Sequence, residues 1–246
     1  MKRYVILGIL LIVLCAATIW MTSLGTVRIF KLAPPGKLLG AALRHIQIVG
    51  VAEALAIAIG VPIGFLVTRR GFRFVSPLLI GIANIGQTIP TLAFIAMAAL
   101  AIGMGYRAAV IALVAYTVLP IIRNTYAGIR SVDPSVKEAA QGMGMSKWQI
   151  TMRVELPLAR PVIMAGIRTS TVVNVGTAAV AGMIGAGGFG EIITAGIAVR
   201  VTEMVIQGAA PTAALAVALD AALAKAEDWT TPRGLKVLKQ AQWQAQ

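Results

Sequence analysis

The sequence predicts an all-α, polytopic membrane protein with about six transmembrane helices and with both termini in the cytoplasm. Its 246 residues are 58% hydrophobic, against roughly 45–50% for an ordinary soluble domain, and a soluble core could not hold that excess. Several apolar stretches reach the roughly 20 residues that a helix needs to cross a hydrocarbon core of about 30 Å. The mean hydropathy of +0.85 agrees with a chain whose main solvent is the bilayer.

The expected spans lie at about residues 4–21, 45–68, 87–104, 107–127, 158–180 and 203–224. Residues 74–86 are also apolar, but a further span there would put the later loops on the wrong side of the membrane. We therefore expect these residues to form an interfacial helix that leads into the third span, with a separate span as the alternative. The first span follows Lys2 and Arg3 as a signal peptide would, but it is long and lacks a small-x-small cleavage site, which favours an uncleaved signal anchor.

The formal net charge of +13 can be explained by the excess of Lys and Arg that membrane proteins carry in their cytoplasmic segments. If the N-terminus is cytoplasmic, fifteen Lys and Arg residues fall on the inner side and six on the outer side. A nucleic-acid-binding surface would instead gather basic residues with polar and aromatic neighbours on one soluble face, so no nucleic acid is expected as a partner. Cys15 and His45 are the only residues of their types, which excludes an intrachain disulfide and a Cys/His metal site.

Three regions are expected along the chain: a signal-anchor span with an outer loop at 1–44, a membrane core at 45–225 and a cytoplasmic tail at 226–246. Within the core, residues 128–157 form the longest polar connection between the late spans, on the cytoplasmic side. Such a long connection is usually functional.

Two short helices are predicted within 128–157. Asp133 can cap the first, with Pro134 at its first position, and Gly144 provides the stop. Ser146 and Gln149 form a capping box for a second helix. The second helix carries Trp148 and is expected to close at Leu156-Pro157, before the next span begins.

The first of these helices has one apolar face. Its members recur at helical spacing: Val136, Ala139, Ala140 and Met143. The face has no membrane to enter, so it packs either against the chain's own spans or against another protein, and physics alone leaves both possibilities open.

The loop resembles the EAA loop of bacterial ABC importer permeases. The resemblance rests on Glu138-Ala139-Ala140, Gly144, Val154 and Leu156-Pro157 in their fixed spacing, with Val154 where isoleucine is commoner. It implies that the loop is a coupling helix, which also includes Met143 and Trp148 and which sits in a groove of a cytoplasmic ATPase. In this role Glu138 would orient the helix or pair with a basic group of the ATPase, Ala139 and Ala140 would allow close approach, and Gly144 would turn the chain.

Other segments resemble the branch of this family that imports osmoprotectants such as glycine betaine, carnitine, choline or proline betaine. They are IGQTIPTLAF at 85–94, ELPLARPVIMAGIRT at 155–169 and IGAGGFGEII at 184–193, together with EAAQGMGMSKWQI at 138–150 in the loop itself. The resemblance covers about residues 45–225. Methionine permeases share the GAGG and IGxxIP features, so methionine or another amino acid is the alternative substrate. The resemblance implies a multi-pass protein of the bacterial inner membrane, in contact with lipid. Its partners would be ABC ATPase subunits, an extracytoplasmic substrate-binding protein and a second permease copy or paralogue.

No cofactor and no catalytic residue is expected in this chain. Residues 185–190 match G-x-G-x-x-G, but a dinucleotide site needs a preceding strand, and a glycine-rich helix break near the outer end fits better. The sequence contains no P-loop motif, so ATP hydrolysis is expected in a partner chain. A single His, a single Cys and no convergent acid pairs argue against an enzyme, whereas an ion-coupled secondary transporter would need broken helices and usually repeat symmetry.

Ionisable groups inside spans are costly and mark a pathway or a pair. For Glu53 and Asp220, near span ends, snorkelling to the interface is preferred. Arg168 begins a polar stripe that either faces a water-filled cavity or bonds neighbouring helices. The candidate pathway residues are Arg168, Thr169, Ser170, Asn174, Gly187 and Gly188. Aromatic residues make up only 6% and are scattered, so an aromatic cage for a quaternary ammonium group is expected in another protein.

Overall fold

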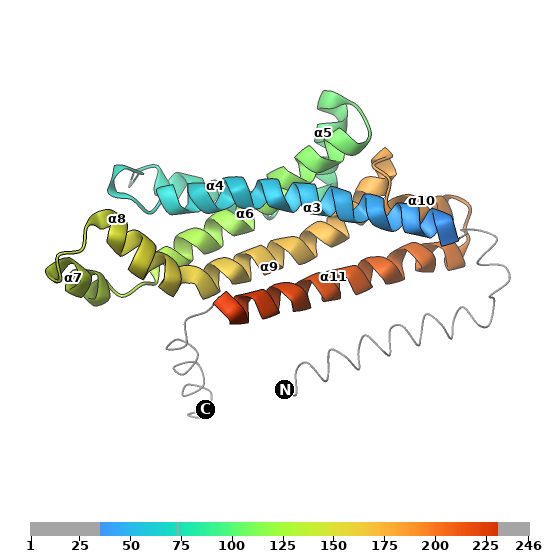
Figure 1. Ribbon diagram of the computed structural model, residues 1–246. Helices are drawn as coiled ribbons and strands as arrows, with labels where there is room; N and C mark the ends of the chain where they lie inside the picture. The colour runs from blue at the N-terminus through green and yellow to red at the C-terminus, as the bar shows by residue number, and fades with distance from the viewer. Residues whose placement is uncertain (1–34, 73, 231–246) are drawn as a thin grey trace, which may run out of the picture. The chain divides into compact units, whose positions relative to one another are not determined.

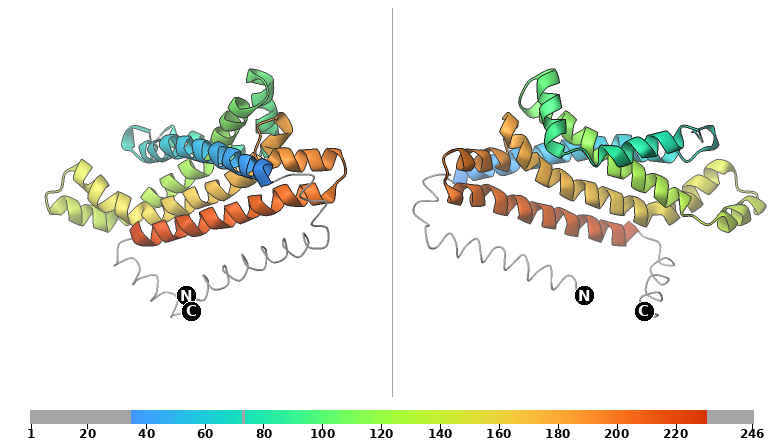
Figure 2. Two further views of the ribbon diagram at one scale, coloured as in Figure 1. Left: turned by 45° about the vertical axis from the view of Figure 1, so that its right-hand side comes forward. Right: turned by 180° about the vertical axis from the view of Figure 1, so that it is seen from behind.

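The computed structural model describes residues 35–72 and 74–230, and these residues form helices and no strands (Figure 1). In chain order the elements are α3 (Pro35–Leu66), η1 (Arg70–Phe72), α4 (Ser76–Gly86), α5 (Thr91–Ile102), α6 (Tyr106–Arg130), α7 (Pro134–Gly142), α8 (Lys147–Ile150), η2 (Thr151–Glu155), α9 (Leu156–Val180), η3 (Ala181–Ile184), α10 (Phe189–Ala198) and α11 (Thr202–Thr230). Figure 2 shows them from two further sides. The predicted all-α fold class is confirmed.

Several helices are long and apolar enough to cross a membrane. Among the described residues, three single helices meet this requirement of length and composition, at Gly36–Leu66, Tyr106–Arg130 and Thr202–Trp229. The number rises to five if each of two bent helix pairs counts as one span. The span expected at 4–21 lies outside the described residues, so a total of six spans and the position of both termini stay predictions.

The third span differs from the prediction. Instead of a single helix at 87–104, the structure has α4 and, after a break, α5 at Thr91–Ile102, which at 12 residues is too short to cross a bilayer alone. Pro90 explains the break, because it disfavours helical backbone at Ile89 before it. A separate helix was expected at 74–86, and its position at the membrane interface stays a prediction.

The helix α10, of ten residues, was not predicted. It follows the glycine-rich stretch 185–188, in which Gly185, Gly187 and Gly188 have positive φ values. The density of glycines concealed the helix, because such a stretch marks the end of one helix more clearly than the start of the next.

Residue contacts divide the chain into two compact units. The first comprises residues 1–54, 90–116 and 171–220. Its core contains Ile48, Val49, Ala52, Ile95, Ala109, Val110, Ala112, Leu113, Val175, Ala178, Ala181 and Ala186. Small residues allow backbones to approach closely here: a Cβ atom added to Gly190 would lie 2.0 Å from the carbonyl oxygen of Ala179.

The second unit comprises residues 55–89, 117–170 and 221–246. Its core contains Ile129, Val132, Ala159, Ile163 and Ile167, and Ile57, Val61 and Phe65 of α3 pack against them. The short helices α7 and α8 belong to this unit, and Figure 1 shows them where α6 ends and α9 begins. The loop predicted at 128–157 therefore lies wholly in the second unit.

Replacing Gly190 by alanine should destabilise the first unit, because the new methyl group would collide with the backbone of Ala179. Overpacking of this kind costs about 1–3 kcal/mol or more. We expect a lower yield of monodisperse protein and a lower melting temperature in detergent. The matched control is Gly176→Ala, since a Cβ atom there meets nothing within 4 Å. Equal melting temperatures for the two variants would contradict the close approach.

Candidate functional site

The first helix of the loop, α7, begins as predicted. The Asp133 carboxylate oxygen Oδ1 accepts a 2.8 Å hydrogen bond from the backbone N–H of Ser135, and Pro134 occupies the first turn. The backbone and side-chain hydrogen bonds of Ser135 hold the pKa of Asp133 below its usual range. Asp133 and Pro134 therefore set the start of the helix through local chemistry alone.

The turn between the two short helices is also as predicted. α7 ends at Gly142, and Gly144 has a φ of +79°, a conformation that favours glycine. The N–H of Gly144 donates to the carbonyl of Gln141 at 3.0 Å. Ser146 and Gln149 form both hydrogen bonds of the capping box, at 3.3 Å and 2.8 Å, and α8 follows.

The second helix does not close at Leu156-Pro157, and that prediction is wrong. α8 continues through the π-helix η2 into α9, which begins at Leu156. The N–H of Leu156 donates to the carbonyl of Thr151, five residues earlier. Pro157 lacks an N–H and would crowd the carbonyl four residues earlier, and the wider π turn just before it leaves room for the helix to continue.

The apolar face of α7 is largely exposed. Of its four predicted members only Ala140 is buried, at 2% exposure, while Val136 is 41% and Met143 is 75% exposed. Ala139 is exposed too, as are Glu138 beside it and Trp148 of α8. Of the two possibilities left open by the sequence, packing against the described part of the chain accounts for Ala140 alone. The other possibility, that this face packs against another protein, stays a prediction.

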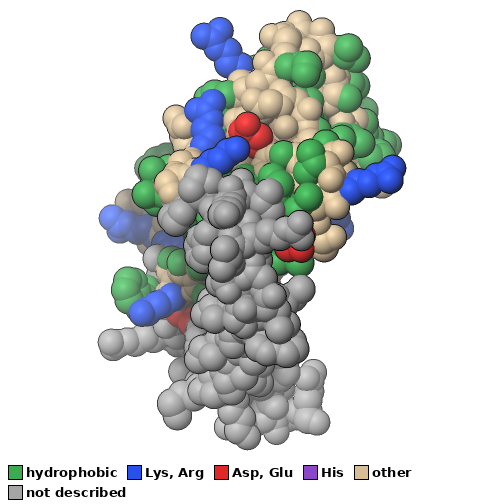
Figure 3. Space-filling model, turned by 90° about the vertical axis from the view of Figure 1, so that its right-hand side faces the viewer, with side chains coloured by type: hydrophobic (Ala, Val, Ile, Leu, Met, Phe, Trp, Pro, Cys, Tyr) green, Lys and Arg blue, Asp and Glu red, His purple; other side chains and the backbone are tan. Residues whose placement is uncertain are grey.

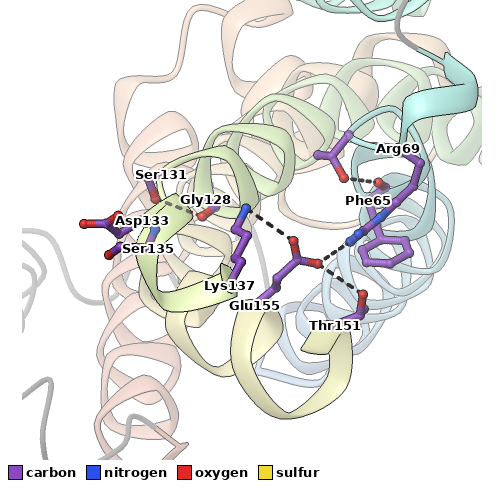
Figure 4. Close-up of polar contacts among 10 residues, drawn as sticks. Phe65, Arg69, Gly128, Ser131, Asp133, Ser135, Lys137, Thr151 and Glu155 are labelled. Carbon is purple, nitrogen blue, oxygen red and sulfur yellow. Dashed lines mark hydrogen bonds and ion pairs between the residues drawn. The ribbon is translucent and has the colours of Figure 1, made fainter. Parts of the chain in front are cut away.

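A charged cluster that sequence reasoning did not single out ties α7 to its surroundings (Figure 4). Glu155, at the end of η2, is the central residue, and its side chain is only 8% exposed. Its oxygen Oε2 lies 2.7 Å from Nη2 of Arg69, and its Oε1 lies 3.3 Å from Nζ of Lys137 in α7. The hydroxyl of Thr151 donates to Oε2 at 3.1 Å. We call Glu155, Arg69, Lys137 and Thr151 the Glu155 cluster.

Burial explains why this carboxylate has several partners. A buried charge is costly unless it is paired and hydrogen-bonded, and the Glu155 cluster supplies two cations and a hydroxyl. The Arg69 guanidinium also lies over the Phe65 ring, 4.0 Å from its centroid. One feature of the sequence could have pointed to Glu155. The chain has only nine Asp and Glu residues against 22 Lys and Arg, and Glu155 is one of these few acids and lies directly before an apolar span, where a carboxylate needs a basic partner.

The candidate pathway residues of the second unit engage neighbouring groups. Nη1 of Arg168 lies 3.2 Å from Oε2 of Glu227 in α11. The hydroxyl of Ser170, which is fully buried, donates to the carbonyl of Ile167, and that of Thr169 donates to Ala165. The ion pair joins α9 to α11, as the helix-bonding alternative requires, and a role in the pathway stays a prediction.

In the first unit, Asn174 is fully buried and its Nδ2 donates to Oε2 of Glu53 at 2.9 Å. Glu53 is 7% exposed, so the preference for snorkelling to the interface is wrong for this residue. The amide of Asn174 provides a donor inside the protein, which makes burial of the carboxylate tolerable.

Gly187 and Gly188 line a cavity of about 460 Å³ in the first unit. The other lining residues are Lys37, Gly40, Ala41, Arg44, Gly185, Ala186, Glu191, Ile192, Ala195 and Met204. The Arg44 side chain closes one wall, because its Nε donates to the carbonyl of Ala186 at 3.2 Å and its guanidinium lies over the Tyr106 ring. Figure 3, which views the end of the molecule where α10 and the start of α3 lie, shows basic and acidic side chains among apolar ones. Asn174 does not line this cavity, and the assignment of the six candidates to a translocation pathway stays a prediction.

The G-x-G-x-x-G match at 185–190 has no dinucleotide-binding context. It is preceded by the 3-10 helix η3, and no strand occurs in residues 35–72 or 74–230. The expected glycine-rich break between helices is confirmed there.

Residues 60–227 match the family described as the inner membrane component of binding-protein-dependent transport systems. The chain belongs to this family. The match includes the whole loop and the Glu155 cluster. It confirms the predicted location in the inner membrane, and it does not support an ion-coupled secondary transporter.

Curated members of this transport family are similar to the chain over most of its length. The choline transport system permease protein OpuBB of Bacillus subtilis (strain 168) is 44% identical over 83% of this chain and 94% of the relative. The glycine betaine/carnitine/choline transport system permease protein OpuCB of the same organism is 42% identical over the same shares. The osmoprotectant import permease protein OsmY of Salmonella typhimurium is 41% identical over 91% and 93%.

Solved structures of ABC transporters are also similar to the chain. An inward-facing structure of the MetNI methionine ABC transporter matches with a TM-score of 0.60 and 25% identity, over 78% of this chain and 93% of that chain. The structural similarity therefore agrees with the permease fold that the loop motif led us to expect.

Replacing Gly144 by valine should impair transport more than membrane insertion. A β-branched residue at a φ of +79° is strained, so the turn between α7 and α8 would be displaced while the long helices remain intact. Gly142→Val is the matched control, because Gly142 ends α7 without a positive φ and a Cβ atom there meets nothing within 4 Å. Transport should be measured at equal amounts of membrane-inserted protein. Normal transport by the Gly144 variant would refute the importance of this turn.

Proposed function

We propose that the chain is the transmembrane permease subunit of an ABC importer that moves an osmoprotectant such as choline, glycine betaine or carnitine into the cell. The support is the similarity to permeases named for these substrates, at 41–44% identity over 83–91% of the chain. A methionine or other amino-acid substrate is the alternative, favoured by the methionine transporter structure at 25% identity. The higher identity argues for the osmoprotectant.

The proposal assigns α7 to the contact with a separate ATPase subunit. The observation that carries it is the exposed apolar face of α7, on a helix whose start and stop are both fixed by capping. An amphipathic helix that lays such a face into a groove is a common mode of protein recognition. The small side chain of Ala139 allows the helix to approach the wall of the groove closely. The exposed Glu138 can pair with a basic group at the edge of the groove.

The proposal also includes the partners and the division of labour. ATP hydrolysis would occur in the partner, with no cofactor bound by this chain and no catalytic residue in it. An extracytoplasmic binding protein would select the substrate, and a second permease copy or paralogue would complete the membrane dimer. The loop 128–157 would lie on the cytoplasmic side, as the distribution of Lys and Arg indicates.

The substrate can be tested by uptake. The chain should be produced with its partner ATPase and substrate-binding protein, in a strain that lacks its own osmoprotectant importers, and given radiolabelled choline, glycine betaine, carnitine or methionine. We expect saturable uptake of at least one quaternary ammonium compound and none of methionine. Uptake that persists when the ATPase carries an inactivating substitution of its P-loop lysine would contradict the proposal.

The ATPase contact can be tested separately. Met143→Asp places a charge at the C-terminal end of the exposed apolar face, and desolvating that charge on docking should weaken binding of the ATPase by about tenfold or more. Gln141→Asp is the matched control, since this exposed residue of α7 lies away from the face. Co-purification and binding titration in detergent measure the effect. If the two variants bind the ATPase with equal affinity, the assignment of α7 to the contact is wrong.

A further inference from the structure

The Glu155 cluster joins three elements that are distant in sequence. Lys137 belongs to α7, Glu155 ends η2, and Arg69 follows the last turn of α3. In Figure 4 Lys137 and Arg69 point toward the Glu155 carboxylate from opposite sides, so that each oxygen meets a different cation. One buried carboxylate is therefore shared between α7 and the end of α3.

Each side of this bridge is anchored in its own helix. The backbone N–H of Arg69 donates to the carbonyl of Leu66 at 3.0 Å, and its guanidinium lies over the ring of Phe65, which packs on the core of the second unit. Glu155 lies in the continuous helical run that leads into α9, and Thr151 fixes its carboxylate from one turn earlier. A displacement of Lys137 thus acts on α9 through the backbone of Glu155 and on α3 through Arg69.

The residues of α7 are arranged for such a transfer. Lys137 faces the carboxylate, whereas its neighbours Val136 and Glu138 are exposed. Ala140 is the buried member of the helix and brings it close to the rest of the unit. The same short helix therefore presents one side outward and holds an ion pair on the other.

We propose that Glu155 is a positioning residue that fastens α7 to the end of α3 and to the start of α9, so that a partner pulling on α7 moves both helices together. This inference rests on the proposed function, because it takes α7 as the contact with the ATPase. Without the cluster, force on α7 reaches α9 through the chain alone and no longer reaches α3 by this route.

The test cuts one link at a time. Lys137→Met removes the cation of α7 while the Glu155 carboxylate keeps Arg69 and Thr151, so the protein should still fold. In the complete importer, reconstituted in vesicles with its ATPase and binding protein, we expect unchanged affinity for the ATPase and a fall of about tenfold in substrate imported per ATP hydrolysed, within the usual range of coupling between linked sites. Lys137→Arg keeps the charge and should restore most of the import per ATP.

Two further variants complete the experiment. Lys147→Met is the matched control, because it removes an exposed cation from the same loop without touching the carboxylate, and it should import like the unaltered chain. Arg69→Met cuts the link to α3 and should uncouple import from hydrolysis in the same way as Lys137→Met.

The outcomes separate the two proposals. If the unaltered permease does not bind the ATPase, the proposed function fails. If it binds and imports, but Lys137→Met and Arg69→Met import as much per ATP as Lys147→Met, the positioning role of Glu155 is overturned while the proposed function stands. A loss of import per ATP in both variants, at unchanged ATPase affinity and with rescue by Lys137→Arg, supports the role.

Discussion

Hydrocarbon offers no hydrogen bonds to backbone N–H and C=O groups, and the described structure follows from that constraint. A segment in the bilayer must pair its backbone internally, which explains the long helices α3, α6, α9 and α11. Prolines lie within all four, at Pro62, Pro120, Pro161 and Pro211, as membrane helices tolerate when surrounding groups satisfy the freed carbonyls. In the two bent helix pairs, irregular backbone lies at short breaks, around Pro90 and at the glycines before α10.

The same constraint governs the few acids. Glu53, Glu155 and Glu227 are shielded from solvent, and each carboxylate meets a donor from another helix or loop: Asn174, Arg69 with Lys137, and Arg168. Because an unpaired charge is expensive in such surroundings, these contacts fix which helices lie together: α3 with α9 in the first unit, and α9 with α11 in the second. These three glutamates therefore hold helices together, in addition to being candidate functional groups.

In the loop, the short helix α7 carries both an exposed apolar face and an ion pair with the buried Glu155. The exposed apolar face of α7 has the character of a surface that binds protein, and Lys137 on the other side enters the Glu155 cluster. Under the proposed function, this arrangement would pass motion from an ATPase bound at α7 to the spans. The π turn before Pro157 would contribute, because it lets α8 run into α9 without a break in the helix.

The features that depend on local chemistry could be predicted from the sequence alone. Composition set the fold class, Asp133-Pro134 and Ser146 with Gln149 set the starts of α7 and α8, and Gly144 set the turn between them, because capping and backbone preferences involve residues only a few positions apart. The spacing of the loop motif was enough to indicate the family. Three features could be learned only from how the helices pack: Glu155 bridges Lys137 and Arg69, Glu53 is buried against Asn174, and Met143 remains exposed. Arg69 and Glu155 stand 86 residues apart and Glu53 and Asn174 stand 121 apart, and which distant side chain neutralises a buried charge depends on how the helices pack.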